Sequence, residues 1–150
     1  SVSETKIVFR AGRAVLTSKL IDGSFPDYQR VIPKGNDKRL VIDNKSFEAA
    51  VDRVSTVSAE RSRSVKLSLE DGKVVLAVNS AETGQGHEEI ECDYGADPME
   101  IGFNAKYLLD VTAQIEAEDA EFMLNDPASP ALILDPADPA ARYVLMPLRV

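Results

Sequence analysis

Histidine and cysteine are almost missing from this chain, which has one residue of each, and tryptophan is absent altogether. The single Cys92 excludes an intramolecular disulfide framework and is typical of a reducing compartment. The single His87 excludes a histidine pair as zinc ligands. No apolar run approaches the ~18 residues of a membrane-spanning helix, and the first residues show no basic-then-apolar signal pattern. We therefore expect a cytoplasmic protein with no cofactor, no metal and no membrane partner.

Positive charge is also scarce, because 17 Lys and Arg residues stand against 25 Asp and Glu residues, for a net charge of −8. A protein that neutralises DNA phosphates directly normally carries a basic face. The charge balance therefore argues against a helix-turn-helix or OB-type DNA binder.

Enzymatic chemistry has few candidate residues. His87 is expected in a polar loop at 83–87, and Cys92 follows five residues later near the start of a strand. An odd separation places two side chains on opposite faces of a strand, which disfavours a Cys–His nucleophile. The loop glycines are not followed by Lys-Ser/Thr, which disfavours a phosphate cradle. The acidic residues at 88, 89, 135 and 138 are expected in exposed loops.

A strand–helix–three-strand pattern occurs twice after an N-terminal hairpin expected over 6–22. In the first unit Asn44 is the expected cap of a helix over 45–58, and Asp71-Gly72 is a hairpin turn. The expected strands of the two units span 40–42, 65–69, 74–78 and 90–94, then 99–103, 121–124, 131–134 and 143–148. The second helix follows a cap at Asn104 and carries the apolar stripe Tyr107, Leu108, Val111 and Ile115.

When the two units are aligned at Asn44 and Asn104, Phe47 aligns with Tyr107 and Val51 with Val111. The offset is 60 residues (104 − 44) at all three pairs. A constant offset favours internal duplication. The predicted fold class is α+β, made of duplicated β-α-β-β-β units with two helices packed on one side of antiparallel sheet.

Two segments are more specific than this general pattern. Residues 23–33 read Gly-Ser-Phe-Pro-Asp-Tyr-Gln-Arg-Val-Ile-Pro, in which two prolines favour an extended, semi-rigid connector. Residues 143–150 read Tyr-Val-Leu-Met-Pro-Leu-Arg-Val, a strand in which Pro147 suits an edge position. Each segment alone has an ordinary explanation, as a linker and as a terminal strand.

Together the two segments resemble the bacterial sliding clamp, the β subunit of DNA polymerase III. In that family an FPDY-x-RV-x-P connector and an MP-[ML]-R-[LV] terminus flank one shared pocket. The resemblance covers essentially the whole chain and identifies it as a C-terminal part of such a subunit with the DNA-clamp fold. It implies that residues 1–33 are the end of the middle clamp domain plus the interdomain connector, and that 34–150 form the C-terminal clamp domain.

The resemblance also implies a function in DNA replication. Sliding clamps are non-catalytic processivity factors that tether DNA polymerase III to double-stranded DNA, which only the full homodimeric ring encloses. A ring holds DNA by topology, so an acidic composition is compatible with this function. Runner-up hypotheses are a stand-alone peptide-binding scaffold of the same fold that does not encircle DNA and, more distantly, an enzyme using His87 and Cys92.

In the family, the shared pocket captures linear peptides of Gln-Leu-x-Leu-Phe character from polymerases, the clamp loader and repair proteins. The residues that would line this peptide-binding pocket are Pro26, Arg30, Val31, Asn104, Tyr107, Ala128, Pro130, Met146, Pro147, Leu148, Arg149 and Val150. Many relatives have a phenylalanine where this chain has Ser62, so one wall is expected to be shallower or more polar. Core packing is the alternative explanation of Met146 and Leu148.

The resemblance implies two further surfaces. Thr56, Val57 and Glu82 would lie at the interface with the partner subunit, and the alternative is an ordinary helix end with a solvated loop. Arg53 and Lys106 are the candidate DNA-facing residues, on helix faces that also carry acidic neighbours.

Overall fold

In the computed structural model, the described residues are 1–24, 27–57, 64–80 and 84–149. The chain opens with a hairpin and a short 3₁₀ helix: β1 (Lys6–Ala11), β2 (Ala14–Lys19) and η1 (Tyr28–Arg30). The first repeated unit contains β3 (Lys38–Asp43), α1 (Asn44–Ser55), β4 (Ser64–Glu70), β5 (Lys73–Ser80), β6 (Gly84–Glu91) and the short β7 (Asp93–Tyr94). The second contains β8 (Met99–Asn104), α2 (Ala105–Thr112), β9 (Asp119–Leu124), β10 (Ala131–Asp135) and β11 (Asp138–Leu145).

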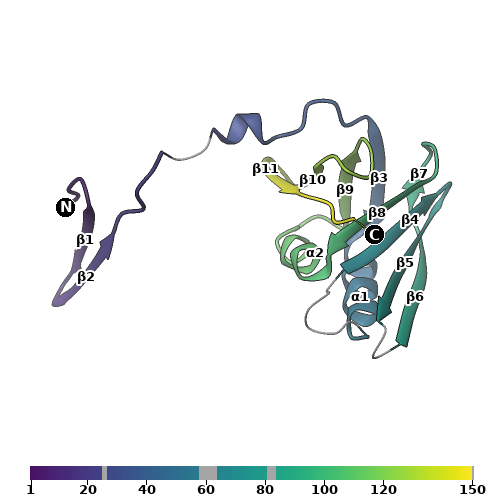
Figure 1. Cartoon of the computed structure of the whole chain (residues 1–150), viewed down its shortest axis with the longest axis horizontal. Helices are drawn as coiled ribbons and strands as arrows, with labels where there is room; N and C mark the ends of the chain where they lie inside the picture. The colour runs from purple at the N-terminus through teal and green to yellow at the C-terminus, as the bar shows by residue number, and fades with distance from the viewer. Residues whose placement is uncertain (25–26, 58–63, 81–83, 150) are drawn as a thin grey trace.

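The strands of the two units are divided between two antiparallel sheets, where the sequence suggested one. The five-stranded sheet has the order β11-β10-β9-β3-β7 and the four-stranded sheet the order β6-β5-β4-β8. Each sheet therefore combines three strands of one unit with the first strand of the other, and the five-stranded sheet also contains the short β7 of the first unit. The two helices contact one another, and Figure 1 shows them beside the two sheets.

The predicted duplication is present, but its register is shifted by one residue. Asp43, rather than Asn44, caps α1, because its carboxylate accepts a hydrogen bond from the amide of Ser46 at 2.7 Å. Asn104 caps α2 as predicted, accepting from the amide of Lys106 at 3.0 Å. The buried helix positions therefore match at an offset of 61 residues (105 − 44), which pairs Asn44 with Ala105, Phe47 with Leu108 and Val51 with Thr112. With this register, Tyr107 turns to the surface, although the predicted stripe placed it in the core.

The core is built from alternate residues of the strands and one face of each helix. Buried and outward positions alternate along β4 and β5, as the period-2 pattern requires. Phe47 of α1 and Phe122 of β9 meet edge to face, with ring centroids 5.4 Å apart. Asn44 donates a hydrogen bond from Nδ2 to the carbonyl of Thr112 at 3.0 Å. Both contacts join the first unit to the second.

Several predicted boundaries differ in the structure. The helix α1 ends at Ser55, and β6 begins at Gly84, so His87 lies on a strand and not in a loop. Gly86 fits there because a Cβ would lie 3.2 Å from Cγ2 of Val57 at the end of α1. The last strand ends at Leu145 instead of continuing to residue 148.

The hairpin β1–β2 lies apart from the other two sheets (Figure 1). Phe9, Val15 and Leu16 are more than half exposed on it. Large apolar side chains on an isolated two-stranded hairpin indicate a surface that packs against further protein. None of the helices among the described residues is both long and apolar enough to cross a lipid bilayer.

Asp135, expected in an exposed loop, is only 3% exposed and organises the loop after α2. Its carboxylate accepts hydrogen bonds from the amides of Glu116 (2.8 Å), Ala117 (3.3 Å) and Ala137 (2.8 Å). These bonds, led by the one from Glu116, hold the pKa of Asp135 below its usual value despite burial. The carboxylate therefore ties the end of the α2 region to the β10–β11 hairpin.

Asp135→Asn is expected to lower the melting temperature at neutral pH, because the new amide group would face backbone N–H donors. A folded-state pKa below the unfolded value gives stability that is present above the unfolded pKa, near 4, and lost as pH falls through the folded pKa. The difference from wild type should therefore shrink below about pH 4 in thermal melts at several pH values. Asp138→Asn, at an exposed carboxylate of the same hairpin, is the matched control and should change little. An equal loss at all pH values would contradict the assignment.

Candidate functional site

The C-terminal tail, residues 146–149, crosses from one sheet to the other. After β11 ends in the five-stranded sheet, the amide of Leu148 donates a hydrogen bond to the carbonyl of Gly102 in β8, at 2.8 Å. Pro147 lies at the crossing, where its missing N–H leaves no ladder bond unmade. Because Gly102 stands two residues before the cap of α2, this bond fixes the tail beside the start of that helix.

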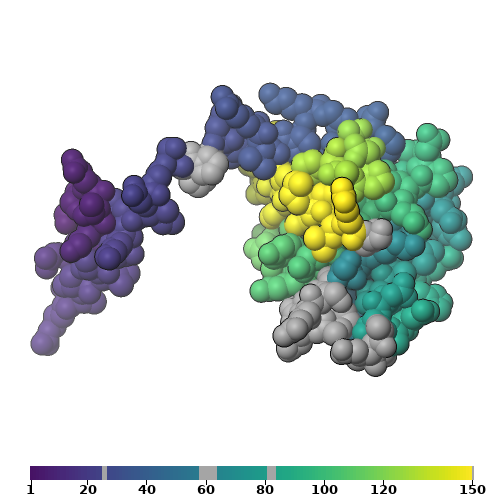
Figure 2. All heavy atoms as spheres, viewed as in Figure 1, coloured from purple at the N-terminus to yellow at the C-terminus, as the bar shows by residue number. Residues whose placement is uncertain are grey.

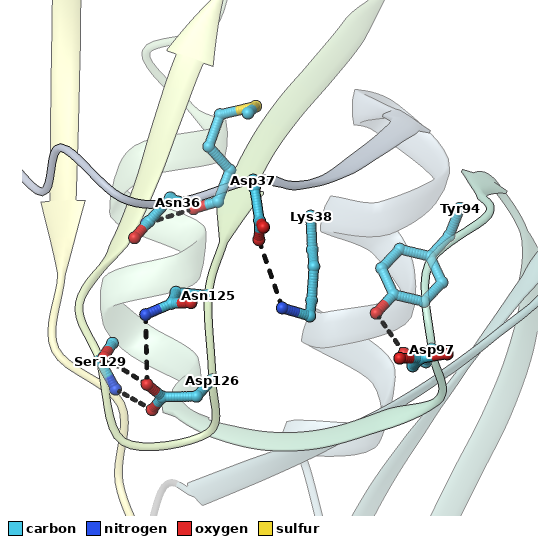
Figure 3. A network of polar contacts seen from close by, with 9 residues as sticks. Asn36, Asp37, Lys38, Tyr94, Asp97, Asn125, Asp126 and Ser129 are labelled. Atoms are coloured by element: carbon cyan, nitrogen blue, oxygen red, sulfur yellow. Dashed lines mark hydrogen bonds and ion pairs between the residues drawn. The ribbon is translucent and has the colours of Figure 1, made fainter.

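The turn at 125–130 forms the next wall. The carboxylate of Asp126 accepts hydrogen bonds from the hydroxyl of Ser129 (2.7 Å) and the amides of Ala128 (2.7 Å) and Ser129 (2.8 Å). The Ser129 hydroxyl, followed by the Ala128 amide, lowers the pKa of Asp126. Asn36 donates from Nδ2 to the carbonyls of Met123 (2.7 Å) and Pro130 (2.9 Å), as Figure 3 shows in part. The segment between the connector and β3 is thus held against the turn.

A hollow of about 620 Å³, the tail pocket, lies between the tail, this turn and the start of β8. Ala128, Leu148 and Arg149 line it, so three residues of the predicted peptide-binding pocket come together here. Lys38 and Asp97, which sequence reasoning missed, also line it; in Figure 3 Lys38 lies between the turn and Tyr94, and Asp97 lies beside Tyr94. Its lining combines apolar side chains, such as Met99 and Leu148, with the charged Lys38, Asp97 and Arg149.

The connector forms a second hollow against β11. This second hollow has a volume of about 490 Å³, and Val31 lines it together with Tyr28, Ile32 and Val144. Arg30 on η1 is exposed, and its Nε lies 3.4 Å from Oδ2 of Asp27. Val31 and Arg30 are thus placed at the β11 edge of the domain, separate from the tail pocket.

Large apolar side chains remain exposed around these hollows. Met146 is 62% exposed, Tyr107 and Val31 53%, and Leu148 41%. Figure 2 shows the yellow C-terminal segment on the surface between the green of α2 and the yellow-green of the second-unit strands. Side chains with this exposure are not part of the core, so core packing does not explain Met146 and Leu148. Asn104 and Pro147 are half-buried, and the Asn104 side chain is used as a helix cap.

Some predicted positions lie outside the described residues: Pro26 and Val150 of the peptide-binding pocket, Glu82 of the subunit interface, and Ser62.

The predicted subunit-interface residues lie where α1 ends beside β6. Thr56 is the C-cap residue of α1, and its hydroxyl donates to the carbonyl of Arg53 at 2.7 Å. Val57 packs close to Gly86 of β6. Because β6 is the outer strand of the four-stranded sheet, one side of its backbone has no neighbouring strand among the described residues.

The two candidate DNA-facing residues, Arg53 and Lys106, differ in whether their charge is paired. Arg53 donates from Nε to Glu88 of β6 at 3.0 Å, and Glu88 is the first cause of the raised pKa of Arg53. Lys106 is exposed in the first turn of α2. Only Lys106 keeps a charge that no ion pair within the described part of the chain neutralises.

The Cys–His pair has no catalytic geometry. Burial raises the pKa of the Cys92 thiol to about 11, with Asp93 as a second cause, so the thiolate is scarce at neutral pH. His87 is exposed on β6, where its strand neighbour is Ala77.

A further hollow, the outer groove, was not predicted from the sequence. It measures about 700 Å³, and its lining comes from the connector and the outer face of the five-stranded sheet: Tyr28, Gln29, Ile32, Pro33, Lys34, Glu121, Leu132, Leu134, Asp135, Pro136, Pro139, Ala141 and Arg142. The unbroken apolar run at 131–134 is the signal that could have found it, because such a run is typical of a strand covered on both faces.

The sequence model of the family described as DNA polymerase III beta subunit, C-terminal domain, matches residues 29–149. The beta sliding clamp of Caulobacter vibrioides is 60% identical over 149 residues, which cover 99% of this chain and 40% of that protein. The solved sliding clamp of Bartonella birtlesii bound to griselimycin superposes with a TM-score of 0.91 at 50% identity, over 99% of this chain and 40% of that one. The clamp of Caulobacter crescentus gives 0.90 at 59% identity, with the same coverage.

These similarities confirm the resemblance and the α+β DNA-clamp fold that the sequence predicted. The chain spans about 40% of the length of the curated relatives that it matches. The residues that match the family's C-terminal domain include the anchored tail.

Leu148→Pro is expected to release the tail from β8, because proline has no N–H to donate to Gly102. Loss of one such hydrogen bond should cost about 1 kcal/mol in the free energy of unfolding, measured by urea denaturation. Amide resonances of Gly102 and Phe103 should shift with it. Leu148→Ala, which shortens the side chain but keeps the amide, is the control. If both variants lose equal stability and leave Gly102 unchanged, the amide does not anchor the tail.

Proposed function

Because the chain belongs to the DNA polymerase III beta subunit family, the bacterial sliding clamps, we propose that it acts as the C-terminal clamp domain of such a subunit. In this proposal it is a non-catalytic part of a cytoplasmic processivity factor that tethers DNA polymerase III to DNA. The observation that carries the proposal is the anchored tail, whose apolar side chains stay exposed beside α2 and the 125–130 turn.

The proposed domain boundary follows the packing of the hairpin. Residues 1–33 would be the end of a middle clamp domain plus the connector, and 34–150 the C-terminal domain. The exposed apolar face of β1–β2, with Phe9 and Leu16, supports this division, since those side chains lack cover among the described residues. The full-length subunit would supply that cover and the second wall of the peptide-binding pocket.

The proposed ligand at the tail is a linear peptide of Gln-Leu-x-Leu-Phe character, from polymerases, the clamp loader or repair proteins. Met146 and Leu148 suit such ligands because flexible apolar side chains adapt to different partners. Arg149 and Arg30 offer guanidinium groups for carbonyl or carboxylate oxygens. The tail pocket supplies a cavity of about 620 Å³ under Leu148, within the usual range for ligand sites.

The proposed ring contacts use the opposite end of the domain. Thr56 and Val57 adjoin β6, whose outer edge can pair with a strand of a partner subunit in a homodimer. Double-stranded DNA would be enclosed only by that full ring, with Arg53 and Lys106 facing it. The ion pair of Arg53 with Glu88 weakens its attraction for phosphate, which suits a surface that slides.

A Gln-Leu-x-Leu-Phe peptide should bind this chain at micromolar strength or more weakly. Two apolar anchors that bury about 200 Å² give roughly 5 kcal/mol at ~25 cal/mol/Å², before ordering costs. In an NMR titration, the amide shifts should cluster at Arg30, Tyr107 and residues 146–150. Met146→Ala and Leu148→Ala should each weaken binding by ~1–3 kcal/mol, and deletion of 146–150 should abolish it while the fold remains.

Val15→Ala is the matched control, since Val15 is an exposed apolar residue of β2, far along the chain from the tail. It should leave the affinity unchanged. Shifts confined to residues 83–89, or a truncated chain that melts early but binds normally per folded molecule, would disprove the peptide site.

Linear duplex DNA should bind negligibly at physiological salt, because the net charge is −8 and this chain alone does not close a ring. Fluorescence titration of a labelled duplex measures this. Submicromolar binding that falls steeply with salt would instead favour direct recognition of DNA by this domain.

A further inference from the structure

The outer groove adjoins the second hollow, with which it shares Tyr28, Ile32, Pro139 and Arg142, but it has no lining residue in common with the tail pocket. It runs between the connector, from Tyr28 to Lys34, and the outward face of β10 and β11. In Figure 1 the connector passes above these strands before it enters β3. None of the described residues predicted for the peptide-binding pocket lines this groove. An inference drawn from this groove therefore does not depend on a peptide at the tail pocket.

The walls of the groove are apolar and rigid. Leu132 and Leu134 of β10 turn their side chains outward and are half-buried beneath the connector. Pro33, Pro136 and Pro139 are among its lining residues, and each has a backbone φ fixed by its ring. Such a cavity needs little reorganisation to receive a ligand, and its volume of about 700 Å³ lies in the range of known sites.

The charged side chains of the groove differ in whether they already have a partner. Glu121 accepts from Nε of Arg39 at 2.7 Å, and Asp135 accepts three backbone amides, so both carboxylates are already satisfied. Lys34 and Arg142 are exposed, and no ion pair or side-chain hydrogen bond within the described residues engages either. In a chain of net charge −8, the two available charges of the groove are thus both positive.

We propose that the outer groove binds a short extended peptide that combines apolar side chains with carboxylates. The apolar side chains lie on Leu132, Leu134 and Ala141, and the carboxylates pair with Lys34 and Arg142. The charge complementarity selects an acidic ligand over a neutral or basic one. A peptide containing proline suits the site best, because its extended conformation is already restricted before binding.

The test is an NMR titration of the ¹⁵N-labelled 150-residue chain with acetyl-Asp-Leu-Pro-Leu-Glu-amide. A neutral twin, acetyl-Asn-Leu-Pro-Leu-Gln-amide, has the same shape without the carboxylates. The acidic probe should shift the amides of Ile32, Leu132, Leu134 and Ala141 at about 1 mM. The neutral twin should bind roughly 3–10-fold more weakly, as expected for two exposed ion pairs.

Variants of the groove distinguish the contribution of charge to peptide binding from that of shape. The double variant Lys34→Gln, Arg142→Gln should weaken the acidic probe by the same factor and leave the neutral twin unchanged. Lys45→Gln, at an exposed lysine of α1 outside the groove, is the matched control. Ala141→Trp should fill the groove and abolish binding of both probes. If Ala141→Trp does not fold, the double variant decides alone, because its two positions are exposed.

Three results would overturn the proposal. One is equal affinity of the acidic probe and its neutral twin. Another is a shift pattern centred on Ala128 and Leu148, which assigns the probe to the tail pocket. The third is the absence of any shift in the groove at about 1 mM.

Discussion

The exchange of first strands between the two repeated units is the constraint on which the rest of the structure depends. β3 of the first unit pairs with β9 of the second over six residues, and β8 of the second pairs with β4 of the first over six. Neither unit can complete its sheet alone. The exchange also brings α1 against α2, where Asn44 bonds to Thr112 and Phe47 packs on Phe122. The two units are therefore expected to fold as one cooperative domain.

The exposed tail is a consequence of the same exchange. β11 ends in one sheet, while β8, the edge strand nearest the start of α2, belongs to the other. The chain must cross the boundary between the sheets to reach Gly102, and at a crossing its side chains are covered from one side only. Met146 and Leu148 thereby stay accessible although they are apolar. The exposed apolar surface at the tail is thus a product of the topology and needs no loop insertion.

The pairing of charges decides which parts of an acidic protein can attract acidic ligands. Arg39, Arg53, Lys66 and Lys73 are each paired with a carboxylate of a neighbouring element. Exposed pairs of this kind add little to stability. They do, however, engage these four cations, so the unpaired cations beside the hollows are the ones available to an acidic ligand.

The sequence by itself determined the elements, because these depend on local pattern: alternation along β4 and β5, the apolar stripe of α1, and a hairpin turn at Gly72, whose φ of 74° favours glycine. The sequence motifs at 23–33 and 143–150 also identified the connector and the tail. Only the tertiary structure decided the roles of Tyr107, Asp135 and Leu148. Their local patterns allowed a core tyrosine, a solvated aspartate and a strand residue. The outcome depended on what lies opposite each one, such as the amides around Asp135 or the Gly102 carbonyl. Those partners are distant in sequence, and no local periodicity encodes them.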